Sequence, residues 1–285
     1  MSTTSIEYKE TTTVLHVSDL SVVYGDKTII NNINFEERDV VRADKTQGQC
    51  IAFVGRSGRG KSTLFRMLTG MQSPTSGRVL IPDFTKPVTD GSQPAKLIVE
   101  GDVGFVDQKY TLFRNKTVYQ ALLFALRQKD LPQGEKEKLI NEHLINWGLD
   151  KVKNSFPFQL SGGQRQRTAI LEQLLNSGNY IVLDEPFSGL DVGNIESVKK
   201  AFKLIGDSHE FNTTIFSTHD IELAVELADS IYVIGYPKDA NNNLVPTGTI
   251  LKHFDLKKMG LAWETEFSMK HLEVANEIKG IMLAS

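Results

Sequence analysis

The sequence lacks several features that mark particular classes of protein. It has one cysteine, Cys50, among 285 residues, which excludes an internal disulfide and a cysteine-rich metal site and suits a reducing cytosol. No run of about eighteen apolar residues occurs, so we expect no membrane span. The start, MSTTSIEYKETTT, has neither a basic stretch nor an apolar run, so we expect no secretory leader. If the protein works at a membrane, another subunit must hold it there.

Composition and charge narrow the class further. The net charge is −3, so no basic field favours nucleic acid as a partner. A hydrophobic share of 40% is enough to fill a core, and the length fits one large domain or two small ones. Cys50 opens the apolar run CIAFV, so we interpret it as a small core residue.

The first part of the chain alternates between β-prone segments and polar loops. Residues 1–13 are polar, and we expect a flexible N-terminus there. Residues 14–25 and 26–40 are β-prone with partial alternation, which predicts an antiparallel sheet. Residues 39–48 and 73–96 are interpreted as polar loops, the second being rich in Pro, Gly, Ser and Thr and carrying an insertion over 85–96.

Continuous apolar runs and amphipathic stretches predict an α/β core. The run at 51–54 precedes a glycine-rich turn and a helical pattern over 61–71, which together start an α/β unit. Further strands are predicted at 103–106, 180–186, 214–220 and 231–235, and a helix at 220–229. Amphipathic patterns at 117–128 and 135–149 predict a mostly helical insert over about residues 109–178.

The predicted domain therefore covers residues 14–250, and a tail follows at 251–285. In this tail Leu272, Ala275, Ile278 and Met282 recur at helical spacing, which predicts a terminal helix that packs on its own domain.

The stretch GRSGRGKST, residues 55–63, matches the phosphate-binding pattern G-x-x-x-x-G-K-[ST] between a strand and a helix. Glycines let the backbone turn its N–H groups inward, and the helix start adds positive charge. Lys61 is expected to reach the β- and γ-phosphates, and Ser62 to offer its hydroxyl to Mg²⁺. The candidate ATP contacts here are Gly55, Ser57, Gly58, Arg59, Gly60, Lys61, Ser62 and Thr63. We expect the side chains of Arg56 and Arg59 to face solvent or phosphate.

Two carboxylates emerge at the end of the buried strand YIVLDEP, residues 180–186. Ligands bind at this end of such sheets. Asp184 is predicted to hold Mg²⁺, and Glu185 to polarise the water that attacks the γ-phosphate. The alternative is an acidic strand end that caps the next element.

These motifs, taken in order, resemble those of the ATP-binding cassette (ABC) ATPases over about residues 14–240. Tyr24 stands where the family stacks an aromatic ring on adenine. Gln108, Asp191 and His219 fall at the Q-loop, the D-loop and the switch histidine, and LSGGQ, residues 160–164, is the family signature. The resemblance implies an α/β P-loop NTPase (RecA-like) core, an antiparallel β subdomain and a helical insert that carries the signature.

The resemblance gives the glycine pair in LSGGQ a purpose. In the family two cassettes meet head to tail, and the signature of one contacts the γ-phosphate held by the other. Ser161, Gly162, Gly163 and Gln164 would then be ATP contacts across a dimer. The alternative for Ser161 is a simple helix cap.

The resemblance also implies roles for the remaining motif residues. His219 would contact the γ-phosphate and hold the attacking water, and Gln108 would bind Mg²⁺ or that water. Asp191 would cross the dimer interface. The alternatives are a histidine satisfied at a strand end, a solvated loop glutamine, an N-cap at Asp191 and an ordinary strand tyrosine at Tyr24.

Two departures from the family pattern bear on the surface and not on the ATP chemistry. Glu172 and Gln173 replace an Ala-Arg-Ala-like run in the signature helix, and the loop at 39–48 is long.

The sequence also indicates which branch of the family the chain resembles. The interval between phosphate loop and signature is too short for the coiled coil of chromosome-type members, and one cysteine cannot supply the zinc sites of excision-repair members. The segments FPFQLSGGQRQR, DEPFSGLD and THDIELAVELAD look most like importer cassettes of the nitrate, sulfonate and taurine type.

The resemblance therefore predicts an ATPase that uses ATP and Mg²⁺. It would pair with a second cassette and power transport through transmembrane permease subunits, from the cytoplasmic face of a membrane. The alternative is a soluble cassette ATPase for cluster assembly or nucleic-acid maintenance. The cargo, the direction of transport and the identity of the second cassette stay open.

Overall fold

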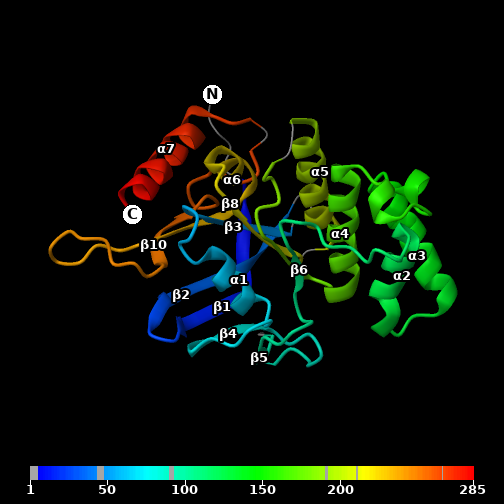
Figure 1. Ribbon diagram of the computed structural model, residues 1–285, viewed down its shortest axis with the longest axis horizontal. Coiled ribbons are helices and arrows are strands. Elements are labelled where there is room, and N and C mark those ends of the chain that lie inside the picture. The colour runs from blue at the N-terminus through cyan, green and yellow to red at the C-terminus, as the bar shows by residue number, and fades with distance from the viewer. Residues whose placement is uncertain (1–5, 44–47, 90–92, 190–191, 210, 265) are drawn as a thin grey trace.

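The computed structural model describes residues 6–43, 48–89, 93–189, 192–209, 211–264 and 266–285. Its strands form two sheets (Figure 1). The four-stranded antiparallel sheet has the order β2-β1-β4-β5, and the six-stranded sheet has the order β10-β9-β3-β8-β7-β6.

The antiparallel sheet is built from the N-terminal third of the chain. It contains β1 (Tyr8–Tyr24), β2 (Lys27–Arg42), β4 (Ser76–Pro82) and β5 (Ala95–Leu97). The hairpin of β1 and β2 confirms the predicted antiparallel pair. Both strands are longer than predicted, because residues 8–13 belong to β1 and residues 39–42 to β2. The region 73–96 is not only turns, since it supplies β4 and β5.

The six-stranded sheet follows the apolar runs of the sequence. It contains β3 (Gln49–Val54), β6 (Gly104–Val106), β7 (Tyr180–Leu183), β8 (Thr213–Thr218), β9 (Ser230–Gly235) and β10 (Thr249–Asp255). The first five are parallel, and β10 is antiparallel to β9. Strands β7, β8 and β9 are buried along their whole length, as expected for parallel strands covered on both faces.

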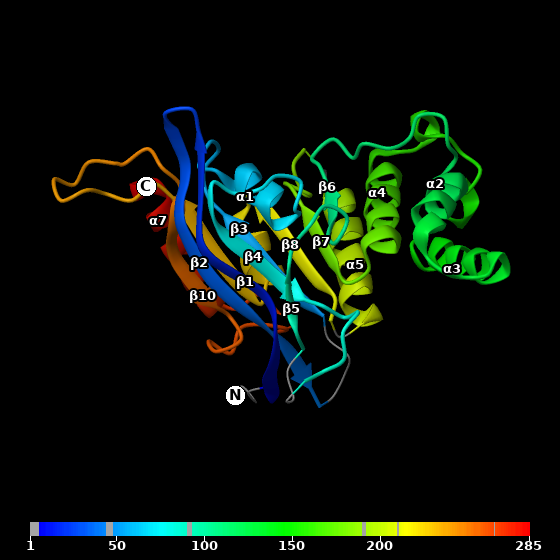
Figure 2. The same ribbon diagram turned by 90° about the horizontal axis from the view of Figure 1, so that it is seen from below.

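Helices cover both faces of this sheet. They are α1 (Lys61–Leu68), α2 (Val118–Ala125), α3 (Gln133–Asn146), α4 (Gly162–Ser177), α5 (Val192–Ser208), α6 (Ile221–Leu227) and α7 (Met269–Ala284). Alternate residues of β3 face different clusters, as the pleat of a strand requires. Phe53 belongs to the core cluster of α1 and the antiparallel sheet, whereas Val54 belongs to the cluster of α4, α6 and α7. Both views place α2 and α3 at one side, beyond α4 (Figures 1 and 2).

The terminal helix was predicted to pack on its own domain, and α7 does so. Ala275 and Ile278 are fully buried in the core cluster that also contains α6. Lys279 donates to Glu222 of α6 at 2.7 Å on the rim of this contact.

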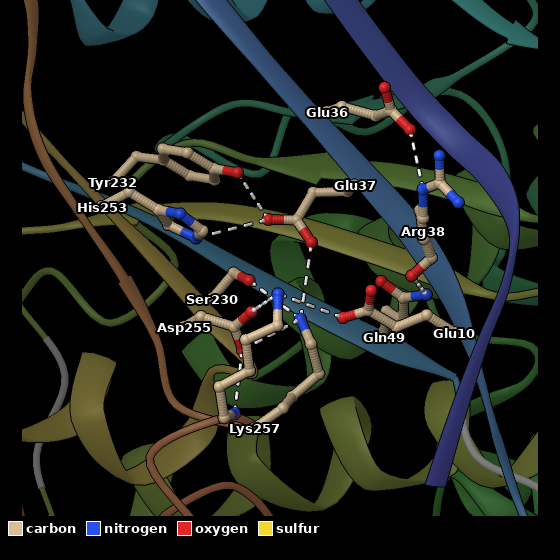
Figure 3. Close-up of polar contacts among 11 residues, drawn as sticks. Glu10, Glu36, Glu37, Arg38, Gln49, Ser230, Tyr232, His253, Asp255 and Lys257 are labelled. Carbon is tan, nitrogen blue, oxygen red and sulfur yellow. Dashed lines mark hydrogen bonds and ion pairs between the residues drawn. The ribbon is translucent and has the colours of Figure 1, made fainter.

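A buried charge network joins the two sheets (Figure 3). Glu37 of β2 accepts a hydrogen bond from the Tyr232 hydroxyl of β9 at 2.6 Å. The Lys257 ammonium lies 3.5 Å from the Glu37 carboxylate and donates to the Ser230 hydroxyl at 3.0 Å. Asp255 is 3.7 Å from the same ammonium. Burial alone would lower the pKa of Lys257, but the surrounding carboxylates raise it, so this lysine stays charged.

Candidate functional site

The phosphate loop runs from the end of β3 to the start of α1. Gly60 is the N-cap of α1 with a φ of 96°, a left-handed conformation that favours glycine. Gly55 has no room for a side chain, because a Cβ there would lie 2.3 Å from the Ile234 carbonyl oxygen of β9. The first N–H groups of α1 have no partner within the helix, and a bound anion is a natural acceptor for them.

Lys61 turns its amine back over this loop. The Nζ atom donates to the Gly55 carbonyl at 2.6 Å and lies 3.7 Å from Glu185 Oε1. Burial lowers the pKa of Lys61, while Glu185 and Asp184 act to raise it. The neighbouring side chain, Ser62, is exposed. The lysine is therefore placed between the loop and the acidic end of β7, where the sequence predicted it to meet phosphate.

Asp184 and Glu185 leave the end of β7 and are fixed by one serine of the neighbouring strand. The Ser217 hydroxyl of β8 donates to Asp184 Oδ1 at 2.6 Å and accepts the Glu185 N–H at 2.9 Å. Glu185 has a φ of 51°, which is rare for a residue with a long side chain. Backbone strain of this kind is found at functional sites, where the surroundings hold it in place.

His219 completes the cluster from the segment after β8. Its Nδ1 lies 2.8 Å from Glu185 Oε2, while its ring is largely exposed. Glu185 thus lies between Lys61 and His219, so the structure brings together all three predicted catalytic residues. A carboxylate, an imidazole and an ammonium group meet at the carboxyl ends of parallel strands, which is the position expected for a ligand site in such a sheet.

Gln108 links the segment after β6 to the acidic strand end. Its Nε2 donates to the Ser188 hydroxyl at 3.0 Å, and the Ser188 N–H donates to the Glu185 carbonyl at 3.1 Å. Gln108 is therefore two hydrogen bonds from Glu185, which suits a residue that reports on the catalytic strand end.

Two residues that the sequence analysis did not single out hold the same strand end. The Tyr110 hydroxyl and the Gln166 amide both donate to the Pro186 carbonyl, at 2.8 and 2.6 Å. Gln166 also donates to the Tyr110 hydroxyl at 2.8 Å, and burial raises the pKa of Tyr110 to about 12. A signal for Gln166 was present, because it shares a helix face with the apolar Ala169 and Ile170.

The signature residues begin α4. Ser161 is the N-cap, and it and Gln164 bond reciprocally as a capping box. The capping role weighed for Ser161 is therefore present. Gly162 is exposed, and a Cβ on it would meet nothing within 4 Å in the described part of the chain. Gly163 is buried.

The helices that follow the signature and the phosphate loop pack on opposite faces of the sheet. Helix α1 packs into the cluster shared with the antiparallel sheet, and α4 packs into the cluster on the opposite face (Figure 2). The sequence prediction that a signature meets ATP on a second cassette is consistent with this separation.

The other predicted site residues have varied surroundings. Tyr24 is exposed at the end of β1, and its hydroxyl donates to Gln72 Oε1 at 2.8 Å. Ser57 is exposed and Thr63 half-buried. Arg59 was expected to face solvent or phosphate. Its side chain lies over the Tyr236 ring instead, with the guanidinium 3.9 Å from the ring centre. Asp191 lies outside the described residues.

The donor set suits a magnesium–nucleotide pair better than a free metal. Among the residues that the structure describes, no three His, Cys, Asp or Glu side chains form a metal cluster. Mg²⁺ that arrives with phosphates needs only one or two protein ligands. The exposed hydroxyl of Ser62, the carboxylate of Asp184 and the side-chain oxygen of Gln108 are oxygen donors of the right chemistry.

None of the described helices is both long and apolar enough to cross a membrane.

Comparison with known proteins identifies the family of the chain. A family model described as ABC transporter matches residues 39–188. The sulfate/thiosulfate import ATP-binding protein CysA of Synechocystis sp. is 33% identical over 222 residues, or 78% of this chain and 58% of that protein. The chain thus spans little more than half the length of that relative. The probable protein of this name in Chlorella vulgaris is 33% identical over 241 residues and is covered over 97% of its length.

Solved structures give the same fold. CbiO1 from Clostridium perfringens, part of the ABC transporter complex CbiONQ, superposes with a TM-score of 0.67 at 23% identity. The match covers 95% of this chain and all of that one. The relatives named above carry sulfate and thiosulfate in their names, whereas the sequence alone favoured the nitrate, sulfonate and taurine type, and that subtype stays a prediction. The P-loop core, the antiparallel sheet, the helical insert and these matches agree, and the chain belongs to the ABC transporter family of ATP-binding cassettes.

Proposed function

We propose that the chain binds ATP with Mg²⁺, hydrolyses it to ADP and phosphate, and powers import through partner permease subunits. The observation that carries this proposal is Glu185, held by Ser217 between Lys61 and His219. The names of the CysA relatives support import as the direction. The cargo would be bound by other subunits.

Each group has a part in the proposed reaction. The N–H groups at the start of α1 and the Lys61 amine would hold the phosphates. Glu185 would accept a proton from the water whose oxygen attacks the γ-phosphorus, while the bond to the bridging oxygen breaks and ADP leaves. His219 would orient that water and hold the Glu185 carboxylate. Ser62, Asp184 and Gln108 would hold Mg²⁺, which neutralises charge on the phosphates when bound.

A second cassette is part of the proposal. Ser161 and Gly162 are exposed at the start of α4, on the opposite side of the sheet from α1. A helix N-terminus with no side chain in the way suits an anion held by another molecule. We therefore expect two copies, or this chain and a similar one, to close over two ATP molecules.

The permease contact is proposed at the exposed aromatic surface of the helical insert. Phe113 and Phe158 are exposed, and Phe113 packs edge-on against Phe124 at 5.1 Å. Lone exposed aromatic residues are ordinary, but a group of them is a common feature of protein contacts. Gln108 and Tyr110 lie in the segment that leads to Phe113 and are bonded to the catalytic strand end. A change at the γ-phosphate could therefore be transmitted to this surface through few contacts.

The chain would work at the cytoplasmic face of a membrane, held there by the permease.

The test is a co-purification from membranes of the native organism. The tagged chain and its Glu185→Gln variant are expressed at native level and extracted in mild detergent. We expect polytopic membrane proteins in stoichiometric amount with both, ATP turnover with the first, and at least a hundredfold less turnover with the second. A chain that stays with cytosolic proteins alone would overturn the transport role and favour the soluble ATPase. Normal turnover by Glu185→Gln would overturn the catalytic assignment.

A further inference from the structure

The outer side of the phosphate loop is fastened by three side-chain contacts that the ATP chemistry does not explain. The guanidinium of Arg59 lies 3.9 Å from the centre of the Tyr236 ring. Its Nη2 donates to the Ser285 carbonyl oxygen, just after α7, at 3.1 Å. The Tyr236 hydroxyl donates to the Gly58 carbonyl at 3.2 Å. The loop is thus tied both to the segment after β9 and to the end of α7.

Close backbone approaches surround these contacts. A Cβ on Gly248 would lie 2.2 Å from the Arg59 carbonyl oxygen, and a Cβ on Gly235 would lie 2.6 Å from Ser285 Oγ. Gly248 is itself held to β2, since its N–H donates to the Ile29 carbonyl at 2.8 Å. The Arg59 backbone therefore lies in a packed setting, and its side chain is turned to Tyr236 and Ser285.

The residues beside Arg59 make such an anchor necessary. Gly58 and Gly60 both have positive φ values, 78° and 96°. Glycine allows this conformation but does not enforce it, because it has many other backbone states open to it. A loop of this kind binds phosphate well only if something else holds its N–H groups in place before the ligand arrives.

We infer that Arg59 is a positioning residue for ATP binding, acting through the loop backbone and not by touching phosphate. Its stacking on Tyr236 and its hydrogen bond to Ser285 hold the donors between Gly58 and Lys61 in their binding arrangement. The end of α7 is thereby part of the nucleotide site, although it is more than two hundred residues away in sequence. The inference rests on the ATP-binding part of the proposed function and not on transport.

The test measures ATP affinity by calorimetry, with Mg²⁺ present, on the full chain. Arg59→Ala and Tyr236→Leu are each expected to raise the dissociation constant about tenfold, and Arg59→Lys less, because a lysine can still lie over the ring. The double variant should weaken binding by less than the product of the two single effects, since the two residues share the stacking contact. Catalytic turnover at saturating ATP should stay within about twofold of the parent, because Glu185 and His219 are untouched.

The matched control is Lys279→Ala, which loosens α7 at its contact with Glu222 without reaching the loop. It should leave ATP affinity unchanged, and its melting temperature should fall only slightly, because the Lys279–Glu222 pair is exposed. Equal loss of affinity in the control would show that only the docking of α7 matters and would overturn the inference. So would unchanged affinity in Arg59→Ala. If Arg59→Ala weakens binding and Tyr236→Leu does not, Arg59 acts on phosphate directly and positioning is wrong. A parent chain that binds no ATP would instead refute the proposed function.

Discussion

Glu172 is an acidic side chain in the buried part of the signature helix. It is one of the two residues that depart from the family pattern, and it lies below the aromatic surface of the helical insert. Burial raises its pKa to about 7, while Arg127 and Lys116 act to lower it. Both of these cations also lie over the Phe124 ring, at 4.1 and 4.9 Å. Its charge state near neutral pH therefore bears on the proposed permease contact.

The sign of the resulting pH dependence follows from proton binding. An acid with a pKa raised on folding holds its proton more tightly in the folded chain, so the free energy of unfolding falls as pH rises from the unfolded value toward about 7. Glu172→Gln removes this contribution. We expect the variant to match the parent near pH 4 and to exceed it by about 2 kcal/mol at pH 8.

Urea unfolding across this pH range measures the effect as a difference between the two proteins. Taking the difference cancels other titrating groups, such as buried Asp229. A flat difference for Glu172→Gln would mean that the pKa of Glu172 is the same in the folded and the unfolded chain, and the proposed proton linkage would be wrong.

At the residue scale, sequence predicted the groups that define the chemistry and not those that support them. Lys61, Glu185 and His219 belong to spaced motifs, so their meeting at one sheet edge follows from the strand order. Arg59, Tyr110 and Gln166 act through contacts with segments far away in sequence. The local pattern places Gln166 on the apolar face of its helix, but it does not reveal the partners of any of the three. The strand end that carries Glu185 nevertheless depends on Tyr110 and Gln166.

At the element scale, the link between β2 and the chain after β10 depends on Lys257. This lysine is buried, with 2% of its side chain exposed, and it faces Glu37 and Asp255. Its neighbour Lys258 contacts the same Asp255 at 3.0 Å with 66% exposed. Lys257 and Lys258 are therefore adjacent, contact the same Asp255 carboxylate and differ in burial, so their variants can be compared directly.

We expect Lys257→Met to lower the free energy of unfolding by about 3 kcal/mol, because it leaves the Glu37 carboxylate buried without its cation. Lys258→Met should cost less than about 1 kcal/mol, since water replaces an exposed pair. Glu37→Gln should cost much less in the Lys257→Met background than in the parent. Thermal or urea unfolding at pH 7 measures the parent and all four variants. Equal losses for the two lysines would contradict a buried ion pair as the link.

Strands that are buried on both faces were predicted from the sequence, whereas strands with exposed positions were missed. Strands β3, β7, β8 and β9 are covered on both faces, so their apolar runs stood out in the sequence. Strands β4 and β5 were missed because they lie among prolines, glycines and polar residues and have exposed positions. The first residues of β1 were taken as flexible for the same reason. Pairing with a neighbour, which a single segment does not encode, decides such strands.

At the scale of the whole molecule, the described part of the chain shows no structural need for glycine at Gly162. Its φ is not in the left-handed region, it is exposed, and a Cβ there would meet no atom of the described residues within 4 Å. Glycine also lowers helix stability relative to most residues. The need for it must come from outside the chain, and the proposed second cassette with its γ-phosphate is the candidate.

Gly162→Asp separates folding from assembly. An acidic residue in the first turn of a helix is favourable, so the melting temperature should stay equal or rise slightly. The same carboxylate would face a phosphate held by the partner and repel it, so ATP-dependent dimerisation and turnover should fall at least a hundredfold. Affinity for ATP in the monomer should not change, because Lys61 and its loop are on the opposite side of the sheet.

The control is Gly134→Asp, in the first turn of α3, where the glycine is also exposed and a Cβ would have no neighbour within 4 Å among the residues that the structure describes. It makes the same chemical change at a helix start that no partner is proposed to contact, and it should leave dimerisation and turnover intact. Size-exclusion chromatography with ATP and the phosphate release rate measure both variants. Turnover in Gly162→Asp at the parent rate would mean that the signature glycine contacts no partner phosphate. Loss in both variants would trace the effect to added charge, and only loss confined to Gly162 places the second half of the site on another cassette.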